Sequence, residues 1–168
     1  TTAPVITITS GTDAVELGSS WTDAGATADT GETVTASGAV DTNTAGTYTI
    51  TYTATDGAGN VGTATRTVIV EDTIAPVITV TTGTDTVEQG ATWTDAGATA
   101  DGGETVTSSG TVDINSLGNY TISYTATDAA GNTGTVTRTV TVVETAAPVI
   151  ETQTLNLKAG WNLVSFYV

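Results

Sequence analysis

The chain has 168 residues, with 18 acidic and three basic side chains, and its formal net charge is −15 at pH 7. Such a charge repels nucleic acid and anionic membrane surfaces, and no basic patch is present to overcome the repulsion. No run of apolar residues approaches the roughly 18 needed for a membrane-spanning helix. Cysteine is absent, so no disulfide can stabilise a small domain.

A repeat of 72 residues organises the sequence. The tetrapeptide Ala-Pro-Val-Ile occurs at residues 3–6, 75–78 and 147–150. Residues 3–74 and 75–146 align without a gap and are identical at 51 of 72 positions. A fixed period without insertions is typical of tandem domains.

Each repeat has the size of an ordinary small domain, and a third copy begins at residue 147 before the sequence departs from the pattern. About a quarter of the chain is threonine, a β-branched residue that favours strands. The expected units are a first repeat at residues 1–72, a second repeat at residues 73–144 and a C-terminal tail at residues 145–168.

Short alternating segments separated by Gly, Asp and Asn predict six strands and no helix in the first repeat. The strands are expected at residues 5–10, 13–17, 24–28, 33–40, 47–55 and 63–70. The strongest signal is the fifth segment, in which the apolar side chains at even positions from Tyr48 to Ala54 face one way and threonines face the other. The second repeat predicts the same pattern.

Two large side chains in each repeat have a predicted buried position. Trp21 and its copy Trp93 are expected to anchor the cores. Arg66 and its copy Arg138 lie at inward-facing positions of their strands, and a buried guanidinium requires a carboxylate partner. The candidate partners are Glu16 and Asp23 in the first repeat and Glu88 and Asp95 in the second.

The regular spacing of short strands predicts an all-β fold: two tandem immunoglobulin-like antiparallel β-sandwiches, followed by a C-terminal β-hairpin tail. The Ala-Pro-Val-Ile start, the Trp-Thr-Asp-Ala-Gly-Ala segment at residues 21–26, the alternating residues 46–56 and Ala-Gly-Asn at residues 58–60 sharpen this prediction. Over residues 3–142 the chain resembles the bacterial immunoglobulin-like surface repeats, relatives of the hyalin-repeat domains. The resemblance implies an extracellular stalk or adhesin module at the cell surface.

Residues suited to catalysis are scarce. The sequence contains no His and no Cys, its one lysine is Lys158 in the tail, and its many Ser and Thr residues have no neighbouring base. We therefore expect no enzymatic activity. The lack of lysine within the repeats also excludes an intramolecular Lys–Asn isopeptide bond there.

Acidic and amide side chains are predicted to converge at the junction between the repeats. If the last strand of the first repeat exits at its far end, the loops at residues 101–104 and 128–132 lie beside the linker at residues 71–73. Such oxygen ligands suit Ca²⁺. The predicted calcium ligands are Asp72, Asp101, Glu104, Asp128 and Asn132. The alternative is that these residues only form turns and keep the loops soluble.

The tail departs from the repeat after residue 150. Residues 154–158 and 161–168 predict a β-hairpin around Ala159-Gly160, similar to the opening hairpin of a different bacterial surface domain. Two strands cannot bury their own apolar side chains, so the hairpin is expected to contact the rest of a domain or a neighbouring subunit. The predicted interaction residues are Leu155, Leu157, Trp161, Leu163 and Phe166.

The first functional hypothesis is a non-enzymatic extracellular spacer in a bacterial surface or adhesin protein, with neighbouring immunoglobulin-like repeats as its partners. One alternative is a filament subunit, a homopolymer formed by β-strand addition through the tail. Another is a carbohydrate- or protein-binding module, which requires exposed aromatic side chains. Neither nucleic-acid binding nor membrane insertion is expected, and calcium is the one cofactor considered.

Overall fold

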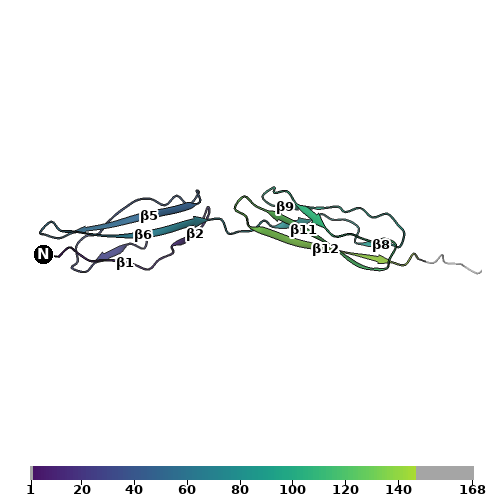
Figure 1. The fold of residues 1–168 in the computed structure, drawn as a ribbon, viewed down its shortest axis with the longest axis horizontal. Helices are drawn as coiled ribbons and strands as arrows, with labels where there is room; N and C mark the ends of the chain where they lie inside the picture. Colours follow the sequence, from purple (N-terminus) through teal and green to yellow (C-terminus); the bar gives the residue numbers. More distant parts are fainter. Residues whose placement is uncertain (1, 147–168) are drawn as a thin grey trace, which may run out of the picture.

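The structure is a computed structural model that describes residues 2–146; residue 1 and residues 147–168 lie outside the described part. Residues 2–146 form twelve β-strands and no helix, in two groups of six that follow one another end to end (Figure 1). The all-β prediction is confirmed. Within these residues there is accordingly no helix long and apolar enough to cross a membrane.

The first domain contains the strands β1 to β6. Their bounds are β1 (Ile6–Ile8), β2 (Ala14–Glu16), β3 (Ala26–Ala28), β4 (Thr35–Ser37), β5 (Gly46–Thr55) and β6 (Val61–Glu71). Strands β1 and β3 form a two-stranded sheet, and the other four form a sheet in the order β2-β6-β5-β4. The chain therefore passes from the small sheet to the large one between β1 and β2.

The second domain repeats this arrangement with β7 to β12. Their bounds are β7 (Ile78–Val80), β8 (Thr86–Glu88), β9 (Ala98–Ala100), β10 (Thr107–Ser109), β11 (Gly118–Thr127) and β12 (Thr133–Val143). Strands β7 and β9 pair, and the larger sheet has the order β10-β11-β12-β8. Each domain is a sandwich of a small and a large sheet.

One pairing in each domain is parallel, which alternation in the sequence does not predict. Strand β2 runs parallel to β6, with Ala14 opposite Ile69, and β8 runs parallel to β12. The Ile69 N–H donates to the Asp13 carbonyl at 2.8 Å, and the Leu17 N–H donates to the Glu71 carbonyl at 2.9 Å. The second and last strands of each domain are thus paired directly, while all other strand pairs are antiparallel.

The core of each domain lies between its two sheets. The buried apolar residues are Val15, Ile50, Tyr52, Ala54, Val68 and Val70 in the first domain and Val87, Ile122, Tyr124, Ala126, Val140 and Val142 in the second. Tyr52 and Tyr124, each 1% exposed, are the largest fully buried side chains. The inward orientation predicted for the alternating strand is therefore observed.

The tryptophans are less buried than the sequence predicts. Trp21 and Trp93 are half-buried. Trp21 packs against a cluster that contains Val15 and Val68, and its indole Nε1 donates to the Thr12 carbonyl at 2.7 Å. Because each tryptophan lies in the loop after the short parallel strand, it covers the edge of the core and leaves the centre to tyrosine.

The arginines are buried as predicted, but one of the two predicted carboxylate partners in each domain is wrong. Arg66 is 3% exposed, and its Nη1 binds Asp13 at 2.8 Å, while its Nε lies 3.6 Å from Asp23. Glu16 instead accepts hydrogen bonds from Thr73 in the linker. Glu16 lies in β2 opposite Glu71, beyond the level of Arg66, so its carboxylate reaches the linker and not the guanidinium.

In the second domain, Arg138 is 4% exposed and pairs with two aspartates. Its Nη1 lies 2.9 Å from Asp95, and its Nε lies 3.2 Å from Asp85. Glu88 is therefore not the second partner either. Asp85 precedes β8 as Asp13 precedes β2, so both domains recruit the carboxylate from the same crossover segment.

Candidate metal site at the junction between the repeats

The linker between the domains is short and is held from both sides. Strand β6 ends at Glu71 and β7 begins at Ile78. On the side of the first domain, the Thr73 N–H donates to the Glu16 carboxylate at 3.0 Å, and the Thr73 hydroxyl donates to it as well. On the side of the second domain, the Asn132 Nδ2 donates to the Asp72 carbonyl at 3.0 Å.

These bonds also affect the protonation of the groups that make them. The pKa of Glu16 is lowered, chiefly by the hydrogen bonds from the Thr73 side chain and backbone. The pKa of Asp128 is lowered too, first by the hydrogen bond from the Asn132 side chain. Both carboxylates are therefore ionised at neutral pH; Glu16 bonds to the linker directly, and Asp128 bonds to Asn132, which bonds to the linker.

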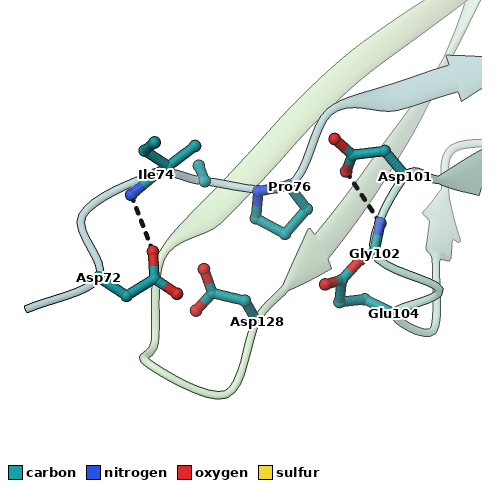
Figure 2. Close-up of a pocket in the computed structure, with 8 residues that line it drawn as sticks. Asp72, Ile74, Pro76, Asp101, Gly102, Glu104 and Asp128 are labelled. Carbon is teal, nitrogen blue, oxygen red and sulfur yellow. Dashed lines mark hydrogen bonds between the residues drawn. The ribbon is translucent and has the colours of Figure 1, made fainter. Parts of the chain in front are cut away.

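A pocket of about 250 Å³ lies between the linker and two loops of the second domain (Figure 2). Its lining residues are Asp72, Ile74, Ala75, Pro76, Asp101, Gly102, Glu104 and Asp128. Four of the five predicted calcium ligands thus line one pocket. Asn132 does not line it but bonds to two of the residues that do.

Three of the pocket carboxylates accept hydrogen bonds from nearby backbone or side-chain groups. Asp72 accepts from the Ile74 N–H at 3.2 Å, as Figure 2 shows. Asp101 accepts from the N–H groups of Val77 at 2.9 Å and Gly102 at 3.1 Å. Asp128 accepts from the Asn132 N–H and Nδ2, both at 2.9 Å. These bonds are the turn contacts named by the alternative interpretation.

Glu104 differs from the other pocket acids. Its Oε2 is buried and has no hydrogen-bond partner. In the first domain the corresponding Glu32 accepts a hydrogen bond from the Thr30 hydroxyl. Residue 102, which corresponds to Thr30, is glycine and cannot supply that donor. A buried carboxylate oxygen without a partner is costly, and a bound cation is one way to satisfy it.

The observed arrangement is not a formed metal centre. Within residues 2–146, no group of three or more acidic side chains is placed so that it could hold a metal ion. The oxygen donors are of the type that Ca²⁺ prefers. The backbone hydrogen bonds of Asp72 and Asp101 use Oδ1 of each carboxylate, so convergence on an ion would require a change in side-chain positions and not the loss of those bonds.

Each domain also has a pocket beside its tryptophan, which the sequence did not predict. The pocket of the first domain is about 320 Å³ and is lined by Trp21, Glu16 and several Ser and Thr residues. Its copy beside Trp93 is about 380 Å³. The signal in the sequence is the small hydroxyl residues on both sides of each tryptophan, which leave part of the ring uncovered.

The predicted interaction residues of the tail lie outside the described residues. This applies to Leu155, Leu157, Trp161, Leu163 and Phe166.

The sandwich geometry, with its crossover between sheets and a parallel terminal pair, defines an immunoglobulin-like class of domain. A family model described as "Bacterial surface protein, Ig-like domain" matches the chain twice, at residues 6–70 and 75–142. The chain therefore belongs to the family of bacterial surface protein Ig-like domains. The resemblance inferred from the sequence motifs is confirmed.

Three relatives of known sequence are similar to the chain. It is 38% identical over 74% of its length to an uncharacterized 81.3 kDa protein of Acholeplasma phage L2, of which it covers 19%. It is 36% identical over 89% of its length to hyalin of Strongylocentrotus purpuratus, covering 14% of that protein, and 40% identical over 62% of its length to hyalin of Lytechinus variegatus, covering 22%. The chain thus spans less than a quarter of each relative's length.

Proposed function

We propose that the two domains are a non-enzymatic spacer in an extracellular surface protein, where they hold another part of the protein away from the cell. The first support is the path of the chain, which enters the first domain at one end and leaves it at the other (Figure 1). Strand β6 has 11 residues, and at about 3.3 Å per residue it alone spans about 36 Å. Tandem domains connected in this way gain length with every repeat.

The observation that carries the proposal is the linker held from both sides. Thr73 is bonded to Glu16 of the first domain, and the Asp72 carbonyl is bonded to Asn132 of the second. A free linker would let the domains fold back on one another. Bonds on both sides limit that motion, so the pair keeps its extended form.

Small-angle X-ray scattering of the full chain tests the proposal. A compact globule of 168 residues would have a radius of gyration of about 15 Å, and we expect a value well above it. Glu16→Ala should reduce the value because it frees Thr73. Glu88→Ala is the matched control, since Glu88 occupies the same position of the second domain. A compact particle would contradict the proposal, and a polymer would support the filament alternative.

We further propose that calcium binds in the junction pocket and stiffens it. The support is the buried, unpartnered Oε2 of Glu104 beside three other carboxylates. Binding to the folded state raises stability by mass action, so millimolar Ca²⁺ should raise the melting temperature and a chelator should lower it. Gly102→Thr, whose Cβ would collide with the Glu104 carboxylate and so displace it, should weaken the response. If calorimetry detects no heat of binding, these acids only form turns.

A second candidate function is carbohydrate binding in the pockets beside Trp21 and Trp93. A partly exposed tryptophan, hydroxyl groups and a carboxylate are a suitable lining for a sugar ring. Glycan-array binding that is lost in a Trp21→Phe, Trp93→Phe double variant would support this function. Unchanged binding in that variant, or no binding by the intact chain, would contradict it.

A further inference from the structure

The parallel pairing of the second and last strands determines how each domain responds to a force applied to its two ends. In the first domain the chain enters before β1, and β2 and β6 then run in the same direction with β6 leading to the exit. A pull on the two ends therefore slides β2 and β6 along each other. Their hydrogen bonds, including Ile69 N–H to Asp13 and Leu17 N–H to Glu71, are strained together and not one after another.

The side chain of Arg66 joins the same two segments. Arg66 lies in β6, and its guanidinium donates to the Thr9 carbonyl and to the Asp13 carboxylate. Thr9 and Asp13 lie on either side of Gly11 in the crossover from β1 to β2. The last strand is thus hydrogen-bonded to the crossover immediately before the parallel pair begins.

The crossover has room for the guanidinium because residue 11 is glycine. A Cβ at Gly11 would lie 2.7 Å from Arg66 Nη1 and 2.9 Å from the Ala24 Cβ. The backbone of Gly11 does not need a left-handed conformation, so space is the constraint. Tyr52 completes the contact, since Arg66 Nε donates to its hydroxyl at 3.2 Å.

The second domain has the same contact. Arg138 of β12 donates to the Thr81 carbonyl and lies 3.2 Å from Asp85, and Gly83 lies between those two residues. Arg66 and Arg138 are the two basic side chains of residues 2–146. The chain has no cysteine for a disulfide and no lysine within its repeats for an isopeptide bond. Both arginines are thus placed where the last strand of a domain contacts the crossover that precedes its second strand.

We propose that each domain has a force-bearing function, in which the arginine clasp on the crossover and the parallel strand pair resist tension along the chain as one unit. The clasp consists of Arg66, Thr9, Gly11 and Asp13 in the first domain and of Arg138, Thr81, Gly83 and Asp85 in the second. The proposal rests on the proposed spacer function only for the source of the tension. The resistance itself is a property of each domain.

Single-molecule force spectroscopy on the full chain tests the clasp. Because the chain has no native cysteine, cysteines introduced at exposed Thr2 and Ala146 give unique handles for an end-to-end pull. Arg66→Lys keeps the charge but removes the fork, and Asp13→Asn is a gentler change at a residue whose side chain is 56% exposed. We expect each variant to unfold its first domain about tenfold faster at a given load, while the unaltered second domain is the internal reference.

Two controls separate force resistance from ordinary stability. Handles at exposed Ser19 and Ile74 pull from the same end of β2 and β6, so they separate the pair one hydrogen bond after another. The intact domain should unfold at a lower force in this direction than end to end. Arg66→Lys should change this lower force little. Ala54→Gly, in β5 and away from the clasp, lowers stability without touching the crossover, and should weaken the end-to-end response less than Arg66→Lys does.

Two results would overturn the inference. One is an Arg66→Lys domain that unfolds at the same end-to-end force as the unaltered first domain, with the second domain as the reference in both chains. The other is a variant that loses equal force end to end and between the Ser19 and Ile74 handles, since that pattern reports stability alone. A compact particle in scattering would refute the spacer function and leave these results unaffected, so the two proposals fail separately.

Discussion

The two repeats contain the same buried polar network but bond it differently. In the first domain, Arg66 Nη1 pairs with Asp13 at 2.8 Å, while Asp23 lies 3.6 Å from Nε. In the second, Arg138 Nη1 pairs with Asp95 at 2.9 Å, and Asp85 is beside Nε. The closest ion pair therefore moves from the crossover to the loop after the tryptophan.

This difference shows that the guanidinium fork serves two carboxylates at once and is not the partner of a single one. The residues of the network are identical in the two repeats. The difference therefore lies in how the guanidinium is positioned and not in which residues surround it. In the second domain, Nε lies near Asp85 but makes no hydrogen bond. The first domain uses that nitrogen to bind the Tyr52 hydroxyl.

The largest expected effect comes from removal of the cation. Arg66→Met leaves two aspartates without their partner, and breaking a buried ion pair typically costs 3 to 5 kcal/mol; partial exposure of the aspartates places the expected loss near about 3 kcal/mol. Arg138→Met should lower the free energy of unfolding by the same amount if the guanidinium positions in the two domains are energetically equivalent. Urea unfolding of the full chain should then show a separate early transition in each variant. A loss under about 1 kcal/mol in either would contradict the network's structural role.

Truncation of the tryptophans should have the next largest effect. Trp21→Ala removes a half-buried ring from the edge of the core, so we expect a loss of about 2 to 3 kcal/mol, at or below the low end for large core side chains. Trp93→Ala should match it within experimental error. Thermal unfolding checks both variants. A loss near zero in either would mean that the ring packs only loosely and would strengthen the carbohydrate-binding candidate.

Filling the crossover glycines sharpens the comparison. At Gly11 a Cβ would lie 2.7 Å from the guanidinium, whereas at Gly83 the nearest guanidinium nitrogen would be 3.2 Å away. Overpacking typically costs about 1 to 3 kcal/mol, and we expect Gly11→Ala to lie in that range and to exceed Gly83→Ala. Chemical denaturation of the two variants measures the difference. Equal losses of unfolding free energy would mean that the different guanidinium positions in the two domains do not affect stability.

The smallest expected effect is on pH dependence. Burial alone would raise the pKa of Asp23, but the hydrogen bonds from Tyr52 and Gly25 and the charge of Arg66 outweigh it, so the pKa is lowered. The pKa of Asp95 is lowered through the same balance. A lowered pKa in the folded state gives stability that is present above the unfolded value of about 4 and is lost as the pH falls through the folded value.

Melting temperatures measured from pH 7 to pH 2 test this dependence. Both domains should lose stability below about pH 4, and Asp23→Asn should flatten the curve of the first domain while leaving that of the second unchanged. Asp95→Asn should do the converse. An unchanged acid slope in both variants would mean that these two carboxylates do not contribute to acid unfolding.

The sequence predicts the long strands better than the short ones. Strand β5 was expected at residues 47–55 and is observed at Gly46–Thr55, because nine alternating residues report both the period and the buried face. Strand β1 was expected at residues 5–10 and is observed at Ile6–Ile8. Beyond Ile6–Ile8 the chain still makes backbone hydrogen bonds at Val5 and Thr9 but no longer forms a strand, so alternation overestimates the length of edge strands.

The sequence correctly predicted that Arg66 points inward and that Asp23 is one of its partners, but it did not predict Asp13. Asp13 is 53 residues away in sequence, and the parallel pairing that places it beside the arginine cannot be inferred from periodicity. The junction was predicted from strand direction alone, and four of its five residues do line one pocket. Side-chain rotamers and backbone hydrogen bonds then decide whether those carboxylates converge, and the sequence pattern contains no information on either.

A spacer must hold its two domains in a fixed, extended arrangement at the junction. The most direct measurement is the distance between spin labels on cysteines introduced at Thr65 and Thr137, two exposed and equivalent positions 72 residues apart. We predict one narrow distance distribution, broadened by Asn132→Ala, which frees Asp72, but not by Asn60→Ala, which changes the corresponding loop of the first domain. A broad distribution in the unaltered chain would contradict the proposed spacer function.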